Sequence, residues 1–548
     1  MTQGLGAAAL AALATPDAYP GDASAPGGVA WVQTHISHVF LTPDRVYKFR
    51  KDVDLGFLCF ATRAERNADC LREVALNRRL APDVYLGVAP VLCEGGAARV
   101  GALREDLADP EHEHVVVMRR LQDGRDALSL LERGELGAAQ LEAVARHLAA
   151  FHRAHRLGIV ALGAEPAWLE RAAAPLRANF ESLRGHAPGL DAEAVATAAA
   201  ATEAGLRRLA GVLESRCRDG RFVDGHGDLH LQHVWFESEG AEPLLVDCIE
   251  FSDELRRIDA ASEVAFLAMD LRYRGRQDLA EHFLASYAAE SDDFDLFAAV
   301  DFYAAYRAAV RAKVAALAAA DPALPAPQRD AARGSAARHL ALAARLLAPP
   351  GPGALLLLCG TVGVGKSSVA RAAARRGLGV PIASDRTRKL GAGLAPTART
   401  GAGVDQGIYT EVRREAVYAG LLERASPIVD SGRLAILDAS FARRRQRDEA
   451  RAWAARRGIE ARLVEVRCRR EVALERLRVR AARGSDPSDV GPEFLDVSLA
   501  RFEPPEEWPP ARHFVIDTSQ TGWEPRLEGW LRTPSGGAPA SPEEQARP

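Results

Sequence analysis

The feature that most constrains the fold is the octapeptide at residues 360–367, which reads GTVGVGKS. Its glycines let successive backbone N–H groups curl around a phosphate, Lys366 can reach the outer phosphates of a nucleotide, and Ser367 offers a hydroxyl to Mg²⁺. An apolar run precedes the motif and a helical pattern follows it, as a P-loop requires. The predicted nucleotide-binding residues are Gly360, Thr361, Val362, Gly363, Val364, Gly365, Lys366, Ser367 and Ser368.

Five apolar runs in the C-terminal part are separated by helical stretches, which is typical of a doubly wound parallel sheet. The runs lie at 354–359, 380–384, 434–438, 463–467 and 514–517. A Pro- and Gly-rich stretch at 348–353 predicts a domain boundary before them. The fold class predicted from this pattern is α/β and multidomain, with a P-loop NTPase domain at residues 349–532.

Two acids follow candidate strands of this sheet. In open α/β sheets, ligands bind beyond the carboxyl ends of the strands. There Asp385 could accept a proton from an attacking hydroxyl, and Asp438 could hold Mg²⁺. Arg388 and Lys389 are candidates for binding an anionic substrate. A helix cap with solvated basic neighbours is the competing interpretation of this segment.

A basic helix further along the chain is a candidate lid. It places Arg476, Arg480 and Arg483 at positions i, i+4 and i+7, on one face. Arginines so arranged could close on a transferring phosphate. A solvated basic face explains the pattern equally well.

A second set of polar residues lies in the N-terminal half. The segment 224–233 reads DGHGDLHLQH, and an apolar run some twenty residues after Asp228 ends in Asp247. Two such acids suit phosphoryl transfer, since one can deprotonate an acceptor and the other can hold metal. Upstream, the strand-like segment around Lys48 precedes a helix that carries Glu73, which could pair with the lysine.

Other interpretations of these residues remain open. His226, Asp228, His230 and His233 could form a zinc site, or the histidines could be structural. On a helix near 300–316, Tyr303, Arg307 and Arg311 could line an acceptor cleft, although a packing helix with a basic edge is the simpler interpretation.

Composition narrows the function classes. The formal net charge of −4 over 548 residues gives no basic field for nucleic acid, and no apolar run approaches the ~20 residues of a membrane helix. The seven cysteines have no CxxC pair, which favours reduced thiols in a cytoplasmic protein. The composition of the termini predicts disorder at residues 1–25 and 533–548. The sequence does not specify an oligomeric state.

Lysine is scarce in this chain. Only five of the 70 basic residues are Lys. A position that keeps lysine is therefore a good candidate for chemistry that needs a compact ammonium. Lys366 and Lys48 are two of the five, and Lys366 joins Asp228 and Asp385 as a candidate catalytic residue.

The C-terminal residues, from 354 to about 530, resemble the P-loop kinases of small molecules and polynucleotides, such as gluconate kinase. In that group an Asp-x-x-Arg after the second strand handles the acceptor, and Asp385 and Arg388 match it. The resemblance implies phosphorylation of a hydroxyl group.

Residues of about 30–270 resemble the aminoglycoside phosphotransferase and choline kinase group of protein-kinase-like folds. The resemblance implies a bilobal kinase-like domain at 26–348. In it Lys48 would bind phosphates, Glu73 would pair with that lysine, and Met118 would lie at the hinge near adenine. Asp228 would be the catalytic base and Asp247 a metal ligand.

Three features depart from that group. One is the patterned segment around Glu250, Phe251 and Asp259, to which the resemblance assigns no role. His233 stands where the group has a metal-binding Asn. The stretch 31–47, which should contain the phosphate-covering loop, has no glycine, so that loop would fall at Thr34 to His38.

Together the two parts resemble a bacterial group described as bifunctional aminoglycoside phosphotransferase-like and ATP-binding proteins, with an AAA-type P-loop. This implies a cytoplasmic phosphotransferase that uses ATP and magnesium (Mg²⁺) on a small hydroxylated molecule. A nucleotide sensor with an inactive kinase-like lobe is the alternative. A polynucleotide kinase is less favoured, because the chain is acidic.

Overall fold

The computed structural model describes residues 4–54, 58–94, 97–105, 109–158, 168–186, 190–395, 398, 406–407, 410–483 and 491–533. The chain forms two compact units. The first contains Met1–Trp168 and Glu214–Asp270, and the second contains Leu169–Leu213 and Leu271–Pro548. Helices from 169–213 and 271–347 therefore group with the C-terminal sheet. The Pro- and Gly-rich stretch predicts a domain boundary at 348–353 instead.

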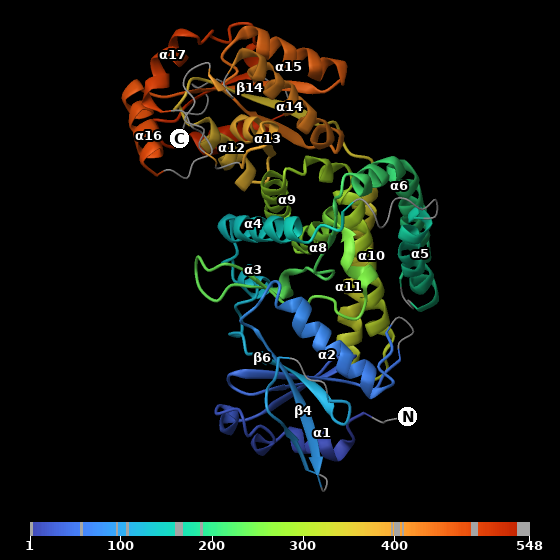
Figure 1. Ribbon diagram of the computed structural model, residues 1–548. Helices are drawn as coiled ribbons and strands as arrows, with labels where there is room; N and C mark the ends of the chain where they lie inside the picture. The colour runs from blue at the N-terminus through green and yellow to red at the C-terminus, as the bar shows by residue number, and fades with distance from the viewer. Residues whose placement is uncertain are drawn as a thin grey trace, which may run out of the picture. The chain divides into compact units, whose positions relative to one another are not determined.

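The first unit is built on a six-stranded antiparallel sheet in the order β1-β2-β3-β6-β4-β5. Figure 1 labels β4 and β6 of this sheet. The strands are β1 (Ala30–Gln33), β2 (Ser37–Leu41), β3 (Arg45–Arg50), β4 (Tyr85–Glu94), β5 (Ala97–Val100) and β6 (Glu113–Arg119). Successive side chains point to opposite faces. Val116 therefore packs with α2 (Arg63–Asn77), while Val115 and Val117 pack with the N-terminal segment.

That N-terminal segment corrects a prediction. Residues 4–25 were expected to be disordered, but they hold α1 (Ala7–Leu13) and the short helices η1 (Pro16–Ala18) and η2 (Ala25–Gly27). Leu13 and Tyr19 are buried in the core of the sheet, and Asp22 accepts a hydrogen bond of 3.0 Å from the hydroxyl of Tyr47. The Ala-rich composition resembles a disordered tail, but its few large side chains cover one face of the sheet. The C-terminal tail after Thr533 lies outside the described residues.

The rest of the first unit positions the loop at 224–233. It includes α3 (Ala127–Glu132), α4 (Ala138–Ala154), η3 (Leu231–His233) and α7 (Asp253–Arg256). Strand β7 (Phe222–Asp224) pairs with β10 (Arg257–Asp259), and β8 (Val234–Trp235) pairs with β9 (Leu244–Leu245). These two short pairs of strands hold the ends of the loop.

The second unit contains a five-stranded sheet in the order β12-β13-β11-β14-β15, with every pair parallel. The strands are β11 (Ala354–Cys359), β12 (Val380–Ala383), β13 (Leu434–Asp438), β14 (Glu460–Arg467) and β15 (His513–Asp517). Strand β11 is buried from its second residue onward, as expected when helices cover both faces. The predicted parallel sheet is confirmed.

Helices α12 (Lys366–Arg375) and α18 (Trp523–Arg532) share one core with this sheet. Helices α14 (Glu411–Asp430) and α15 (Arg444–Arg456) also pack on its strands. The other elements of this part are α13 (Ser384–Gly391), α16 (Arg470–Arg483), η6 (Pro492–Phe494), α17 (Leu495–Ala500) and η7 (Pro510–Arg512).

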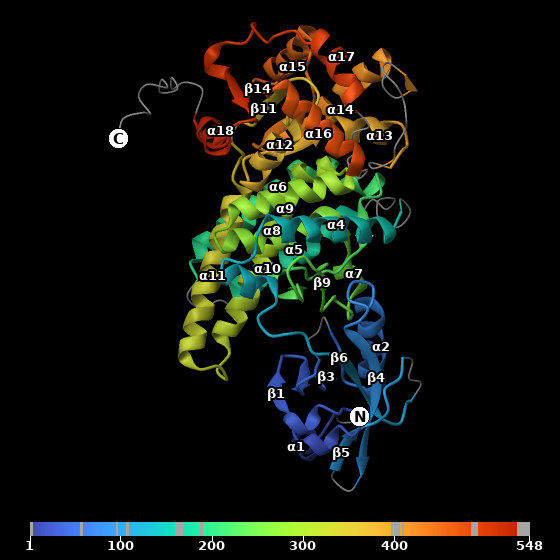
Figure 2. The ribbon, with the colours of Figure 1, turned by 90° about the vertical axis from the view of Figure 1, so that its left-hand side faces the viewer.

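The remaining helices are α5 (Trp168–His186), α6 (Ala192–Arg218), α8 (Ala260–Tyr273), α9 (Gln277–Ser291), η4 (Phe294–Ala298), α10 (Val300–Ala320) and α11 (Ala326–Leu347). The boundaries between the two units fall at the start of α5 and within α6 and α8. Helices α10 and α11 pack closely along their lengths (Figure 2) through small residues such as Ala309 and Ala336, which agrees with the packing interpretation of residues 300–316.

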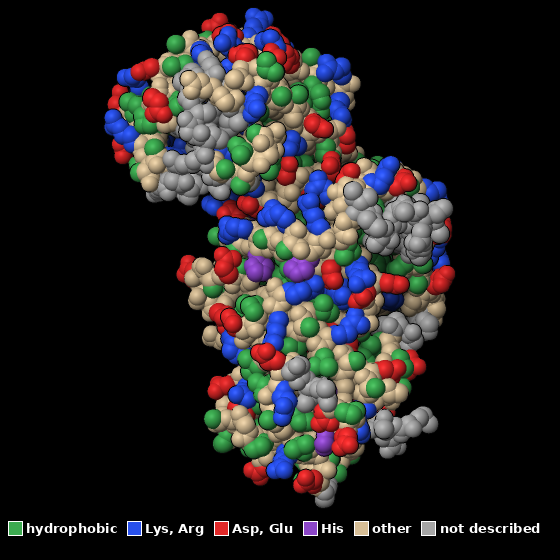
Figure 3. All heavy atoms as spheres, viewed as in Figure 1, with side chains coloured by type: hydrophobic (Ala, Val, Ile, Leu, Met, Phe, Trp, Pro, Cys, Tyr) green, Lys and Arg blue, Asp and Glu red, His purple; other side chains and the backbone are tan. Residues whose placement is uncertain are grey.

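Charged side chains of both signs are interspersed on the face seen in Figure 3. Among the helices that the structure describes, none is long and apolar enough to cross a bilayer.

Candidate functional site

The P-loop lies between β11 and α12, as its motif predicts. Gly360, Gly363 and Gly365 have positive φ angles of 149°, 79° and 95°. A Cβ atom at Gly360 would lie 2.4 Å from the carbonyl oxygen of Val466, so this position requires glycine. The Lys366 ammonium donates hydrogen bonds to the carbonyl oxygens of Gly360 (3.1 Å) and Thr361 (2.7 Å). The loop backbone is thus curled, and the Lys366 side chain folds back onto it.

Two acids lie at the same edge of the sheet as this loop. Asp438 ends β13, which pairs with β11, and Asp385 follows β12, which pairs with β13. Asp438 accepts a hydrogen bond from the Ser367 hydroxyl, and burial raises the pKa of Asp438. Burial lowers the pKa of Lys366, against the opposing attraction of Asp438 and Asp385. Three strands therefore bring an ammonium, a hydroxyl and two carboxylates together.

The two candidate substrate residues on α13 differ in their surroundings. The Arg388 guanidinium pairs with the carboxylate of Asp385, and its side chain is 14% exposed. Lys389 is 1% exposed, so it lies in the interior rather than on an open surface. The structure thus brings Arg388 to the P-loop site, whereas a substrate contact of Lys389 stays a prediction.

Sequence analysis missed Tyr418 and Ser440 near this site. The Tyr418 hydroxyl lies 3.2 Å from the Ser440 hydroxyl, and the Gly360 N–H donates to the carbonyl oxygen of Ser440 (3.0 Å). Burial raises the pKa of Tyr418, while Arg388 nearby acts to lower it. Ser440 could have been found, because it follows Asp438 by two residues. Tyr418 lies within a long helix and left no signal in the sequence.

The candidate lid residues do not act alike. Arg476 donates to the hydroxyl and the carbonyl oxygen of Thr518 (2.8 Å each), and Thr518 in turn donates to the carbonyl oxygen of Val364 (2.6 Å). Arg476 is therefore a brace of the P-loop. The charge of Arg480 helps burial to lower the pKa of Lys366, which places Arg480 near the site. The side chain of Arg483 lies outside the described residues.

In the first unit the structure brings Lys48, Glu73 and Asp247 together. The Lys48 ammonium lies 2.9 Å from Oε1 of Glu73 and 2.8 Å from Oδ1 of Asp247. Burial by itself would lower the pKa of Lys48, but Asp247 and Glu73 raise it well above its ordinary value. Lys48 likewise lowers the pKa of Asp247. Asp247 has a positive φ of 63°, a conformation that is uncommon outside glycine, although Asp adopts it more often than most residues. Such conformations cluster at functional sites.

The loop that carries Asp228 is held by buried side chains. Glu263 accepts hydrogen bonds from the N–H groups of His226 (2.7 Å) and Gly227 (3.0 Å). His226 uses both ring nitrogens, one with the carbonyl oxygen of Val246 (2.7 Å) and the other with the N–H of Asp228 (3.3 Å). Burial lowers the pKa of His226 to about 3. His226 is thus a structural residue, which removes it from the possible zinc site.

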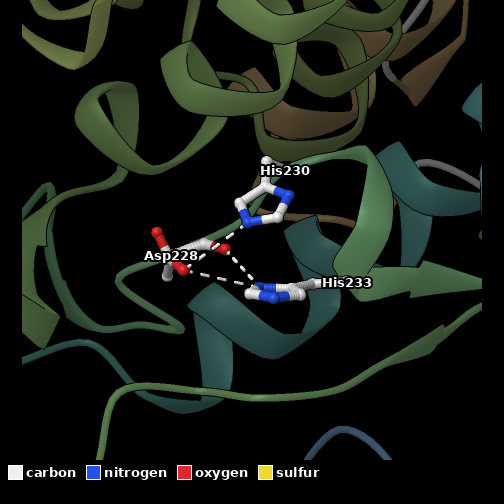
Figure 4. A group of neighbouring side chains, drawn as sticks. All are labelled: Asp228, His230 and His233. Atoms are coloured by element: carbon white, nitrogen blue, oxygen red, sulfur yellow. Dashed lines mark hydrogen bonds and ion pairs between the residues drawn. The ribbon is translucent and has the colours of Figure 1, made fainter. Parts of the chain in front are cut away.

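Asp228, His230 and His233 face one another beyond this loop (Figure 4). Oδ2 of Asp228 lies 3.6 Å from Nε2 of His230 and 3.6 Å from Nδ1 of His233. Nε2 of His233 lies 3.5 Å from Oδ2 of Asp247. Burial acts to raise the pKa of Asp228, but the hydrogen bond from His230 and the neighbouring imidazoles lower it overall.

An arginine that sequence analysis missed joins these groups. Arg50 lies two residues after Lys48 on β3 and donates to Oε2 of Glu73 (2.5 Å) and Oε1 of Glu250 (2.6 Å). Burial raises the pKa of Glu250 to about 8. Glu73 thus bridges Lys48 and Arg50. Residues i and i+2 of a strand share a face, so this alternation was visible in the sequence.

The remaining candidates of the first unit lie on the sheet. Met118, the predicted hinge residue, is half-buried on β6 and pairs with Val46 of β3. The predicted phosphate-covering segment forms the turn between β1 and β2, where the Thr34 hydroxyl accepts a hydrogen bond of 3.0 Å from the Ser37 N–H. Their contacts with a nucleotide stay predictions.

Comparison with curated proteins identifies relatives along most of the chain. Uncharacterized proteins of Mycobacterium tuberculosis and Mycobacterium bovis are 34% identical over 485 residues, which cover 86% of this chain and 89% of each relative. The chain belongs to this family. Residues 355–505 also match a protein-family model described as an AAA domain. That match spans the P-loop, Asp385 and Asp438, and the expected AAA-type P-loop is confirmed.

Solved structures are similar to separate parts of this chain. A gluconokinase from Sinorhizobium meliloti is 22% identical and covers 33% of this chain and 90% of its own, with a TM-score of 0.23. A choline/ethanolamine kinase family protein from Mesorhizobium loti is 16% identical and covers 61% of this chain and 98% of its own, with a TM-score of 0.34.

Proposed function

We propose that this protein is an ATP- and Mg²⁺-dependent phosphotransferase that phosphorylates a hydroxyl group of a small molecule. The observation that carries the proposal is the convergence of Lys366, Ser367, Asp438 and Asp385 at one edge of the parallel sheet. A P-loop alone would suit any nucleotide-binding protein. A second carboxylate beyond the neighbouring strand, paired with Arg388, adds a group that can handle an acceptor.

Each residue would have a distinct task. Lys366 and the curled backbone would hold the β and γ phosphates of ATP, and Arg480 would lie close to the transferring group. Asp385 would take the proton from the acceptor hydroxyl as that oxygen bonds to the γ phosphorus. The bond from phosphorus to the oxygen that leaves with ADP would break in the same transfer. Arg388 would orient Asp385 or an anionic acceptor.

The residues at the P-loop fit a magnesium ion. Ser367 and Asp438 offer a hydroxyl and a carboxylate oxygen that already share a hydrogen bond, and Mg²⁺ prefers oxygen ligands. These two side chains would hold the ion, which would neutralise charge on the transferring phosphoryl group.

The first unit would provide a second nucleotide site. Lys48, fixed by Glu73, would bind phosphates, Asp228 would act as the base, and Asp247 would hold metal. The alternative, a nucleotide sensor whose kinase-like lobe is inactive, is favoured by one observation. His233 occupies the place of an expected metal-binding Asn, with its ring between Asp228 and Asp247.

The test incubates full-length protein with labelled ATP, Mg²⁺ and a panel of sugars, amino-sugars and nucleosides, with a 5′-hydroxyl oligonucleotide included. Transfer to a small molecule is expected, and Lys366→Met should lower its rate by roughly 10²- to 10³-fold. Lys48→Met serves as the matched variant of the other unit. Full activity of the Lys366 variant, or label found on the oligonucleotide alone, would refute the proposal.

A further inference from the structure

The first unit carries a ligand set that Mg²⁺ does not favour. Asp228, His230 and His233 each offer one atom, and these atoms all lie within 4.8 Å of one another. Two of the separations are 3.6 Å, from Oδ2 of Asp228 to a ring nitrogen of each histidine. Figure 4 shows the carboxylate facing both imidazoles. Neighbouring ligands of one ion at about 2.0–2.2 Å are separated by similar distances.

The positions of these three side chains are set by the surrounding protein. The Leu231 N–H donates to the buried carboxylate of Asp270 (3.1 Å), so the backbone between the two histidines is fixed. Glu263 holds the loop just before Asp228 through two backbone N–H groups. The imidazole rings of His230 and His233 lie with their centroids 3.9 Å apart. These contacts hold the three side chains close together before any ion binds.

Asp247 supplies the outer partner that a metal-bound imidazole requires. In the structure Nδ1 of His233 lies 2.9 Å from the carbonyl oxygen of Asp228 and donates to it. When Nδ1 binds an ion, it gives up the hydrogen bond to the carbonyl oxygen of Asp228. Its proton moves to Nε2, which lies 3.5 Å from Oδ2 of Asp247. The ring stays neutral, and the carboxylate accepts the new N–H. Histidines that bind metal commonly donate their second N–H to a carboxylate in this way.

His230 needs one matching rearrangement. Its Nδ1 accepts a hydrogen bond of 3.3 Å from the Gln232 N–H, so the metal-free ring carries its proton on Nε2, facing Asp228. Binding of an ion at Nε2 shifts that proton to Nδ1 and gives up a long hydrogen bond for a metal bond. His226 takes no part, because both of its ring nitrogens have protein partners.

We infer that Asp228, His230 and His233 form a binding site for a divalent transition-metal ion of the zinc class, with Asp247 orienting His233. Two imidazoles and one carboxylate are a common ligand set for Zn²⁺ and leave a fourth position open. Imidazole nitrogen favours Zn²⁺ and Co²⁺ over Mg²⁺, which prefers oxygen. The inference does not rest on phosphoryl transfer, because the ion binds without nucleotide. While the ion is bound, Asp228 is a ligand and Asp247 accepts from His233, so neither carboxylate serves the second nucleotide site. A metal-loaded first unit therefore agrees with the sensor alternative.

The test titrates untagged, chelator-treated full-length protein with Co²⁺ and follows the visible absorption of the bound ion. We expect one strongly bound Co²⁺ per chain, displaced by Zn²⁺ but not by a large excess of Mg²⁺. Asp247→Asn should weaken binding roughly 10- to 100-fold, as expected for an outer partner. His230→Gln and His233→Gln should weaken it more than Asp247→Asn does.

The matched control is His112→Gln. Nδ1 of His112 lies 2.8 Å from Oδ2 of Asp109 in the same unit, an imidazole–carboxylate pair, so its loss should leave Co²⁺ binding unchanged. Thermal unfolding of each metal-free variant shows whether it folds. X-ray absorption of the wild-type protein with Zn²⁺ gives a readout without any variant, and nitrogen and oxygen neighbours are expected. Sulfur neighbours, wild-type affinity in both His variants or equal competition by Mg²⁺ would overturn the inference.

Discussion

The two candidate sites both place a lysine near carboxylates, but they are built in opposite ways. The P-loop site is made from contiguous backbone, and the ammonium of Lys366 bonds to carbonyl oxygens of its own loop. The first unit collects Lys48, Glu73 and Asp247 from three distant segments, and its ammonium lies between two carboxylates. Accordingly the pKa of Lys366 is lowered by burial, whereas carboxylates raise that of Lys48 against the effect of burial.

This difference predicts how readily each lysine can meet a phosphate. Lys366 has uncharged hydrogen-bond partners, which an incoming phosphate can replace at low cost. Lys48 forms an ion pair with Asp247. A metal ion that bound the Asp247 carboxylate could break this ion pair. The P-loop site is therefore the one expected to carry the main activity.

The largest expected effect comes from the two candidate bases. Asp385→Asn should lower acceptor phosphorylation by roughly 10²- to 10⁴-fold, because an amide cannot take the hydroxyl proton. Asp228→Asn tests the same role in the first unit. Steady-state rates at saturating ATP measure both.

ATP binding, measured by calorimetry, is the control for the base variants and should survive Asp385→Asn. Equal losses in the two variants would contradict the view that one site dominates. A loss in Asp228→Asn alone would assign the chemistry to the first unit.

The next largest effect compares a buried arginine of each unit, Arg216 in the first and Arg433 in the second. Arg216 and Asp259 are 2% exposed each and pair at 2.8 Å in the first unit. Arg216→Met leaves the carboxylate without its arginine and should cost about 3–5 kcal/mol of unfolding free energy. Arg433→Met in the second unit should cost less, because Arg272 also pairs with both of its acids, Glu281 and Asp301.

Hydrogen exchange with peptide resolution can assign these losses to each unit, since local opening reports local stability. If Arg433→Met lowered the unfolding free energy more than Arg216→Met does, this prediction would be wrong.

Acid should weaken the first unit. Burial lowers the pKa of His226 from 6.5 to about 3, so its folded form stays neutral where the unfolded chain takes up a proton. The part of the unfolding free energy that depends on a neutral His226 is fully present above pH 6.5. It is lost as the pH falls toward 3. Each pH unit costs up to about 1.4 kcal/mol per such histidine. Burial lowers the pKa of four more histidines in this unit, His38, His114, His147 and His233.

Urea unfolding between pH 7 and pH 5, with amides pulse-labelled at one fixed pH, measures this loss. His226→Gln is the comparison variant and should show a shallower dependence on pH. A first unit whose stability does not change over that range would contradict the assignment of His226 as a buried neutral residue.

The smallest expected effect distinguishes a residue that stabilises the P-loop, Arg476, from a candidate lid residue, Arg480. Arg476→Met removes the hydrogen bonds to Thr518 and should lower the stability of the second unit by roughly 1 kcal/mol, since the arginine is partly exposed. Arg480→Met should slow turnover and leave stability unchanged. Thermal unfolding and steady-state rates of the two variants decide between the roles. If Arg476→Met slowed turnover without loss of stability while Arg480→Met lowered stability, Arg476 would be the lid residue.

Local motifs made much of this molecule predictable. A P-loop is specified by glycines and a lysine within eight residues, and its strand and helix neighbours follow from local periodicity. The order of Lys48, Glu73, Asp228 and Asp247 also pointed to one cluster, which the structure brings together through Lys48 and His233. Glu250 lies in a patterned segment to which the resemblance gave no role, and Arg50 shares a strand face with Lys48. The burial of Arg50 was not predictable, because a buried arginine has no local pattern that separates it from an exposed one.

The sequence by itself determined the parallel sheet, the P-loop and the presence of a second polar cluster, since each depends on short-range pattern. Only the tertiary structure decided which side chains meet. It packed residues 4–25 onto the first sheet, made Arg476 a brace, and set His230 and His233 around Asp228 while His226 turned inward. Contacts between distant segments depend on how whole elements pack, and the spacing of residues along the chain does not contain that information.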